Sequence, residues 1–152
     1  MKWTSEDLQK YVQAKEYIDT AIIPTLGFQM TQEKSMEKDA FQRELLAIYT
    51  NEIEKELSGR VLLTPPYNYI KTNDLGNEVV RLNEWIEHIY KQPFTTIFIL
   101  TFDNQWKKNE KELNGELLWF PSVQTSNIKS EETIHFIRNQ VEQISELIRA
   151  YW

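Results

Sequence analysis

Residues 94–102 limit most strongly what this chain can fold into. They read Phe-Thr-Thr-Ile-Phe-Ile-Leu-Thr-Phe, with little alternation between polar and apolar side chains. A strand with one solvated face alternates, whereas a strand buried on both faces is a nearly continuous apolar run. Doubly buried strands occur in parallel sheets that helices cover on both sides. The segment therefore predicts an interior parallel strand in an α/β fold.

Patterns on either side of this run supply the other elements. Apolar residues spaced three and four apart predict helices over 4–15, 35–57, 74–91 and 130–152. Short apolar or β-branched runs predict further strands over 17–23, 61–63 and 117–120, each ended by a nearby proline. The polar stretch 104–116 is expected to be a loop or a frayed helical turn, and 121–129 a loop. Alternating helices and strands predict an α/β fold: one layered domain with a mostly parallel sheet of about four strands, flanked by helices.

Length and composition exclude several classes of protein. A chain of 152 residues is too short for two ordinary domains. The net charge of -6 disfavours nucleic acid as a partner, because phosphate binding needs clustered basic residues. No apolar run approaches the roughly 20 residues that cross a bilayer, so we expect no membrane insertion. The lack of cysteine excludes disulfides and thiolate catalysis and, with no apolar signal core near the start, favours a cytoplasmic location.

Motifs for metals, phosphates and nucleophiles are missing from the sequence. The two histidines, His88 and His135, fall in separate expected helices, so we expect no bound metal. The four glycines are isolated and form no phosphate-binding loop, and no serine sits in a Gly-x-Ser-x-Gly elbow. We therefore expect neither a metal nor a nucleotide cofactor.

The loops after the expected strands carry the candidate site. Open parallel sheets bind ligands in a crevice at the carboxyl ends of their strands. The loops that follow the first three strands mix amides and aromatic rings, which can hydrogen-bond to and stack on a small ligand. We single out Gln29, Tyr67, Asn68, Tyr69, Asp103, Asn104 and Trp106. The structural alternative is that the aromatic rings cover the sheet edge and the amides cap helices.

The last helix offers a second surface. We expect it to begin at Ser130 and end at Trp152, with apolar residues in one clean stripe. Such a stripe packs on the chain's own sheet or forms a coiled-coil seam with a partner. A protein partner, or a homo-oligomer formed through this helix, is the corresponding hypothesis.

Three segments resemble the YpiF-like proteins of Gram-positive bacilli. They are Met-Lys-Trp at 1–3, Gln-Ala-Lys-Glu-Tyr-Ile-Asp-Thr-Ala-Ile-Ile-Pro at 13–24 and Gly-Arg-Val-Leu-Leu-Thr-Pro-Pro at 59–66. The resemblance covers essentially the whole chain. That family is uncharacterised, so the resemblance implies no mechanism.

A fainter likeness is to creatininase-type amidohydrolases. These proteins also run from a short helix into a strand that ends in proline, then a helix, then a strand before a Pro-Tyr loop. Their Glu-x-His-Gly metal signature would fall at 27–31, where this chain has Gly-Phe-Gln-Met-Thr, and their second histidine motif would fall near 101–105. The likeness therefore implies the fold without the metal that activates water.

Two classes of function follow. The first is a non-catalytic binding or regulatory domain that acts through a protein partner or a small metabolite in the strand-end crevice. The alternative is a metal-independent enzyme in which Asp103 serves as base and Tyr67, Tyr69 or Asn104 holds the substrate. A location of Asp103 on an open convex surface would remove the only acid candidate from the enzyme hypothesis.

Overall fold

Strand β4 (Thr96–Thr101) runs through the interior of the sheet in the computed structural model, which describes residues 1–123 and 128–152. It pairs in parallel with β1 (Thr20–Phe28) on one side and β5 (Glu116–Trp119) on the other. Every residue of 97–101 is buried. The interior parallel strand predicted over 94–102 is therefore confirmed, with slightly tighter bounds.

The other side of β1 carries two short strands in succession. Strand β2 (Val61–Leu63) pairs with the first residues of β1, and β3 (Tyr67–Ile70) pairs with its last residues. Residues 64–66, Thr-Pro-Pro, separate the two strands. The order is β2-β1-β4-β5 with β3 also on β1, so five parallel strands fill four places.

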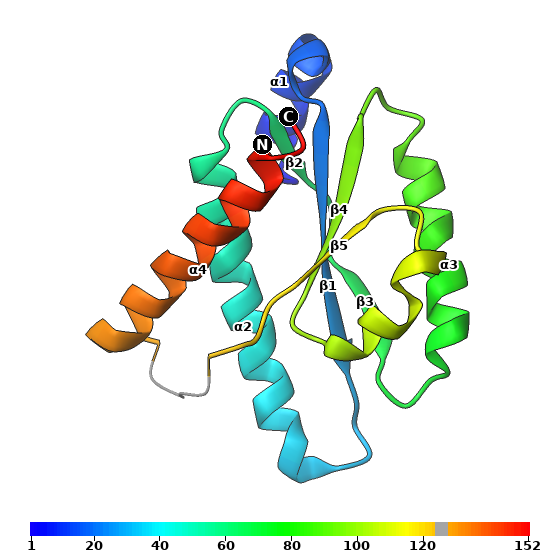
Figure 1. Ribbon diagram of the computed structural model, residues 1–152, viewed down its shortest axis with the longest axis vertical. Helices are drawn as coiled ribbons and strands as arrows, with labels where there is room; N and C mark the ends of the chain where they lie inside the picture. Colours follow the sequence, from blue (N-terminus) through cyan, green and yellow to red (C-terminus); the bar gives the residue numbers. More distant parts are fainter. Residues whose placement is uncertain (124–127) are drawn as a thin grey trace.

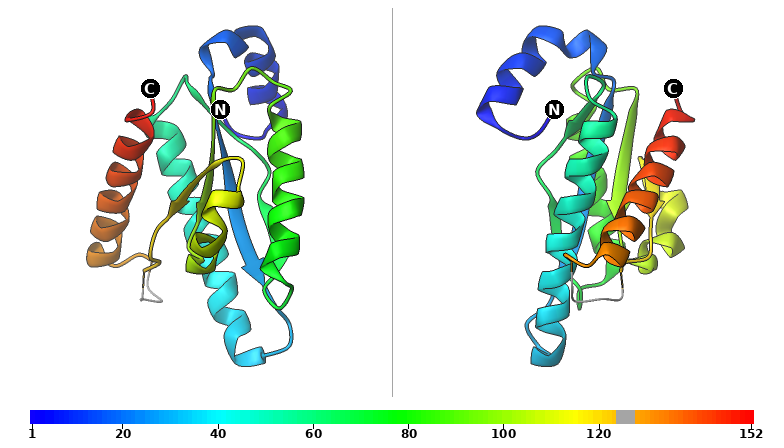
Figure 2. Two further views of the ribbon diagram at one scale, coloured as in Figure 1. Left: turned by 45° about the vertical axis from the view of Figure 1, so that its right-hand side comes forward. Right: turned by 90° about the vertical axis from the view of Figure 1, so that its left-hand side faces the viewer.

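Helices cover both faces of this sheet, as Figures 1 and 2 show. Helices α2 (Glu33–Glu56) and α4 (Glu131–Arg149) lie together over one face, whereas α3 (Leu75–Ile89) and the 3-10 helix η2 (Asn104–Glu112) lie over the other. The chain is thus a three-layer α/β fold with a parallel sheet in the middle. This is the predicted fold class.

Alternate residues of the central strands point to opposite layers. Ile22 and Leu100 join the apolar cluster beneath α2 and α4, while Ile23 and Ile99 join the cluster beneath α3. This alternation is the period-two geometry of a strand, and it makes both faces of the sheet apolar.

Helix α1 (Ser5–Ala14) lies at the end of the sheet where β1 begins (Figure 1). The Thr4 hydroxyl accepts a hydrogen bond from the backbone N–H of Asp7, so the predicted cap is present. A single 3-10 turn, η1 (Lys15–Tyr17), follows. The strand expected from residue 17 therefore begins only at Thr20.

The expectation that Pro24 ends the first strand is wrong. Strand β1 continues through Pro24, which is the register partner of Leu100 in β4. Peptide groups alternate in direction along a strand. The Ile22 carbonyl accepts from the N–H of Thr64 on the β2 side, so the Pro24 nitrogen points to that side as well. It faces the gap between β2 and β3, where no ladder hydrogen bond is lost.

The stretch Tyr67-Asn68-Tyr69, expected as a loop, forms strand β3 instead. Its residues are alternately buried and exposed, which is the pattern of a strand with one solvated face. The two preceding prolines interrupt the edge of the sheet without turning the chain away from β1. Residues 104–112 form the 3-10 helix, while the loop expected over 121–129 lies partly outside the described residues.

Across the described residues, no helix is both long enough and apolar enough to span a membrane.

Candidate functional site

The strand order reverses between β1 and β4. The chain leaves β1 toward β2 on one side of the sheet and later returns to β4 on the other. At such a topological switch point the loops after the two strands diverge and leave a crevice at their carboxyl ends. A pocket of about 560 Å³ lies there, and we call it the switch-point pocket. It is lined by residues at and just after the carboxyl ends of β1, β3, β4 and β5, together with the first turns of α2, which project beyond the sheet in Figure 1.

One wall of the pocket is a hydrogen bond between β3 and the end of β4. The Tyr69 hydroxyl donates to Asp103 Oδ2 at 2.5 Å. Asp103 Oδ1 accepts from the backbone N–H of Gln105 at 3.0 Å and so caps η2, and the Asp103 N–H donates to Thr101 Oγ1. Burial and the neighbouring Asp103 carboxylate raise the pKa of the Tyr69 hydroxyl well above its usual value. Tyr69 is therefore a neutral donor at physiological pH.

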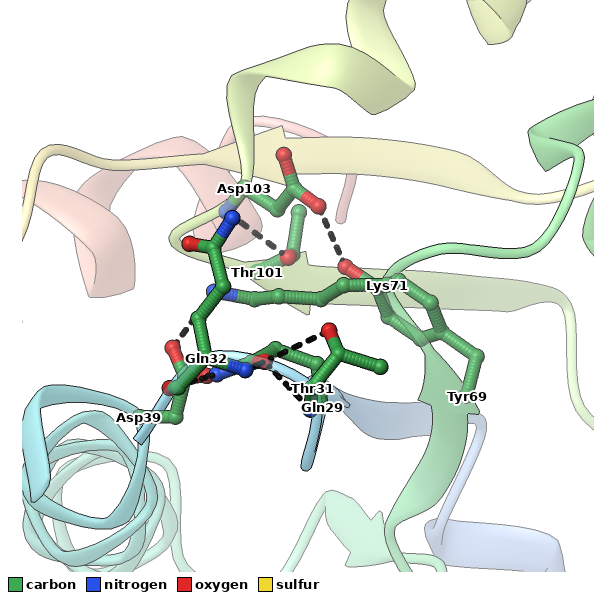
Figure 3. A network of polar contacts seen from close by, with 8 residues as sticks. All are labelled: Gln29, Thr31, Gln32, Asp39, Tyr69, Lys71, Thr101 and Asp103. Atoms are coloured by element: carbon green, nitrogen blue, oxygen red, sulfur yellow. Dashed lines mark hydrogen bonds and ion pairs between the residues drawn. The ribbon is translucent and has the colours of Figure 1, made fainter. Parts of the chain in front are cut away.

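A second wall is an ion pair between Lys71, just after β3, and Asp39 of α2 (Figure 3). Lys71 Nζ donates to Asp39 Oδ1 at 2.6 Å, and the Asp39 side chain is only 8% exposed. Gln29 Nε2 donates to the other Asp39 oxygen at 3.3 Å. The side-chain oxygen Oε1 of Gln29 accepts from the backbone N–H groups of Thr31 and Gln32, which fixes the turn between β1 and α2. A buried carboxylate with this many donors keeps its charge compensated.

Gly27 allows the two walls to approach β1. A Cβ at this position would lie 2.7 Å from Lys71 Cγ and 2.9 Å from Tyr69 Cζ, closer than carbon atoms pack. The side chains that carry both walls therefore lie against the bare backbone of β1.

Aromatic side chains at the carboxyl ends of β4 and β5 add apolar surface to the pocket. Trp119 and Phe102 both line it, and the Trp119 indole N–H donates to the Phe102 carbonyl at 3.0 Å. Lys107 Nζ lies 3.7 Å from the centroid of the Trp119 ring, which is a cation–π contact. Phe102 also packs edge-on against the ring of Tyr49. These contacts hold the rings in place.

The structure brings four of the seven predicted residues into the pocket: Gln29, Tyr69, Asp103 and Asn104. The other three lie at the same end of the sheet but outside it. Tyr67 is fully buried beneath α3, where its hydroxyl donates to the backbone carbonyl of Glu78 at 3.3 Å.

Trp106 and Asn68 also lie outside the pocket. Trp106 is 0% exposed and packs edge-on against Tyr69, so it does not line the loop cluster as expected. Asn68 is exposed on the opposite face of β3 from Tyr69, and its amide donates to the carbonyl of Pro66. The order of the strands in the sequence was enough to predict the end of the sheet at which these residues lie. It did not distinguish aromatic rings that are buried from side chains that line the pocket.

Sequence reasoning missed Asp39, Lys71 and Trp119. Lys71 follows β3, which was not expected to be a strand, so its position at a strand end was hidden. Asp39 is a buried carboxylate on a helix, a rare arrangement that indicates a specific partner, but burial was not apparent from the helical pattern. Trp119 was assigned to a strand interior, whereas it is the last residue of β5.

Within residues 1–123 and 128–152, no three histidine, cysteine, aspartate or glutamate side chains cluster in a way that could hold a metal ion. His88 and His135 are both exposed and lie on different helices, α3 and α4. The expectation that the purified protein carries no metal stays a prediction.

Comparison with known proteins identifies the family. Residues 9–152 match the family described as "Protein of unknown function (DUF2487)". This chain belongs to the DUF2487 family. One relative is the "Uncharacterized protein YpiF" of Bacillus subtilis (strain 168), 27% identical over 152 residues, which cover 100% of this chain and 98% of the relative. The predicted YpiF-like family is therefore confirmed. No solved structure matches the chain, and the likeness to creatininase-type proteins stays a prediction.

Proposed function

We propose that this protein is a non-catalytic binding or regulatory domain that holds a small polar ligand in the switch-point pocket. The observation that carries the proposal is the pocket itself, at the carboxyl ends of β1 and β4 where the strand order reverses. Its volume of about 560 Å³ falls in the range of small-molecule sites. Parallel α/β sheets of many proteins bind ligands at the same place.

The hydrogen bonds between wall residues support a binding site. Tyr69 to Asp103 and Lys71 to Asp39 are contacts between separate elements, and each ties β3 to a neighbour across the pocket. Groups that are already held in one geometry lose little freedom when a ligand arrives. Binding in such a pocket therefore keeps most of its contact energy as affinity.

An enzyme without metal is the alternative. Asp103 lies in a concave pocket, so the acid that this hypothesis needs is well placed. Both of its carboxylate oxygens already accept hydrogen bonds, from Tyr69 and from the Gln105 backbone. A general base must take the substrate's proton on a carboxylate oxygen, where that proton would compete with these two hydrogen bonds. This competition favours binding over catalysis.

A second candidate function is the docking of a protein partner on α4. A groove of about 450 Å³ lies between α2 and α4. Its apolar surface includes Ile48, Ile134 and Val141. Its charged lining residues are Glu52, Glu56, Glu142 and Arg138, which leaves the groove acidic on balance. Ile134 is 45% exposed. This arrangement suits an amphipathic helix with basic flanks, which would protect α4 from hydrogen exchange.

The remaining expectations are part of the proposal. The lack of cysteine supports action in the cytoplasm. The acidic net charge supports a partner other than nucleic acid.

A pocket-filling variant tests the main proposal. Asn104 is exposed at the pocket rim, so Asn104→Trp should fill the mouth of the pocket and leave the fold intact. Lys108→Trp, on the same 3-10 helix but outside the pocket lining, is the matched control. A metabolite library is screened by thermal shift, because a ligand that binds only the folded state raises the melting temperature.

We expect compounds that stabilise the wild type and Lys108→Trp but not Asn104→Trp. Trp119 lines the pocket, so its fluorescence should respond to the same compounds. A library that stabilises none of the three proteins, or all three equally, contradicts a ligand in this pocket. Turnover of a stabilising compound would favour the enzyme alternative.

A further inference from the structure

Charges on the pocket walls cancel one another. Among the described lining residues, the charged side chains are Lys38, Lys71, Asp39 and Asp103, so the lining carries no net charge. Lys71 and Asp39 are paired with each other at 2.6 Å. No arginine is found among these described lining residues, although arginine is the residue that best matches phosphate and carboxylate groups. The walls are therefore poorly suited to a strongly anionic ligand.

Neutral polar groups make up most of the remaining lining. Hydroxyl and amide side chains come from α2, from the end of β3 and from the start of η2, and they include Gln32, Ser35, Gln42, Thr72, Asn104 and Gln105. Hydroxyl and amide groups can each donate and accept hydrogen bonds. The hydroxyl groups of a ligand can also both donate and accept. A ligand with many hydroxyl groups can therefore hydrogen-bond to these walls whichever way its O–H bonds point.

The Asp103 carboxylate adds a directional acceptor to this lining. An ionised carboxylate offers about four acceptor positions on its two oxygens. The Tyr69 hydroxyl takes one position on Oδ2 and the Gln105 N–H takes one on Oδ1. Among the described residues these are the only donors to the carboxylate, so one position remains on each oxygen. Two oxygens on one carboxylate match two hydroxyl groups on adjacent carbon atoms.

We propose that the switch-point pocket binds a small, uncharged molecule with adjacent hydroxyl groups, of the kind found in sugars and nucleosides, and that Asp103 accepts from that hydroxyl pair. This inference rests on the proposed function, because it names the ligand class of the same pocket. Trp119 and Phe102 supply apolar surface for the ring of such a ligand. The Asp103 charge repels a phosphate placed at the same position.

Calorimetric titration with defined probes tests the ligand class. The probes are ribose, glucose, adenosine and uridine, their monophosphates, and a set of free amino acids. Asp103→Asn removes one acceptor oxygen and keeps a residue that can cap η2. Asp74→Asn is the matched control, because Asp74 caps α3 in the same way, outside the pocket lining.

We expect at least one uncharged probe to bind, with affinity at least tenfold weaker in Asp103→Asn and unchanged in Asp74→Asn. Binding of free ribose or glucose would indicate a sugar as the source of the diol. Binding of adenosine or uridine without binding of the free sugars would indicate a nucleoside. We also expect each monophosphate to bind no more tightly than its uncharged parent. That comparison needs only the wild type, so it holds even if Asp103→Asn does not fold.

Two other results separate the failure of the ligand class from the failure of the pocket. Tighter binding of the monophosphates or of the amino acids, abolished by Asn104→Trp, overturns the diol proposal and leaves a ligand in the pocket. Binding of diols that neither Asp103→Asn nor Asn104→Trp weakens overturns both proposals. Absence of binding by every probe at millimolar concentration overturns the diol proposal, and the library screen then decides on the pocket.

Discussion

Replacing Gly27 by alanine tests the contact between β1 and the pocket walls. Glycine in a strand interior is less stable than alanine by roughly 0.5–1 kcal/mol, so a Cβ in open space would stabilise the protein. At Gly27 the new Cβ would lie 2.7 Å from Lys71 Cγ and 2.9 Å from Tyr69 Cζ. Neither atom can stay where it is, and both side chains carry a wall contact of the pocket.

The expected cost follows from two terms. Overpacking costs about 1–3 kcal/mol, and a hydrogen bond to a charged group is worth about 1.5–3 kcal/mol when displacement breaks it. After the intrinsic preference for alanine is subtracted, the free energy of unfolding of Gly27→Ala should fall by about 1.5–5.5 kcal/mol. Urea denaturation followed by circular dichroism measures this change as a lower midpoint with an unchanged slope.

Gly76→Ala is the matched control. A Cβ there would meet Asp74 Oδ1 at 3.4 Å, an ordinary contact, and the residue lies in the first turn of α3. Alanine favours a helix over glycine by about 1 kcal/mol, so this variant should be as stable as the wild type or slightly more stable. Equal midpoints for Gly27→Ala and Gly76→Ala would refute the close packing of Tyr69 and Lys71 on β1.

Three further predictions concern the rest of the molecule. Ile99→Ala should lower the free energy of unfolding by about 2–5 kcal/mol through lost burial and a cavity, whereas exposed Ile134→Ala should change it by less than about 1 kcal/mol; equal melting curves would contradict an interior β4. Burial raises the pKa of Asp19, but hydrogen bonds from Arg60 and Thr20 outweigh burial and hold that pKa below its usual value. The ionised Asp19 carboxylate therefore stabilises the fold above about pH 4, and this stabilisation is lost as the pH falls through the lower, folded-state pKa. Asp19→Asn should therefore lower the urea midpoint at pH 7, and this difference should shrink as the pH is lowered below about 4. A difference independent of pH would argue against the ion pair. A strong chelator should leave the melting temperature unchanged, and elemental analysis that finds one zinc, iron or manganese per chain would contradict this.

Hydrophobic patterning was enough to predict the layers of this fold. The nearly continuous apolar run at 94–102 requires helices on both faces, and the helical stripes at 35–57, 74–91 and 130–152 supply them. Patterning could not place Pro24, because whether a proline fits within a strand depends on what lies beside its nitrogen. Here the interruption at 64–66 lies beside it, forty residues away in the sequence, and only the register of β1 reveals this.

The sequence predicted where the site lies better than it predicted which residues line it. Topology alone brings Gln29 and Asp103 to one end of a parallel sheet, and the sequence order of the strands is enough to predict it. The distinction between Trp106, which is buried, and Trp119, which lines the pocket, depends on the path of η2 beneath the sheet. Side-chain direction within a loop is set by tertiary packing, which local sequence does not encode.

The proline pair between β2 and β3 also affects how the protein behaves at high concentration. An exposed sheet edge recruits strands from other molecules when it presents a long row of free N–H and C=O groups. This edge consists of strands of three and four residues, separated by Pro65 and Pro66, so it offers no such row. Replacement of both prolines by valine would allow one continuous edge strand over 61–70. The same interruption that accommodates Pro24 inside the sheet thus protects the folded molecule from fibrillar association.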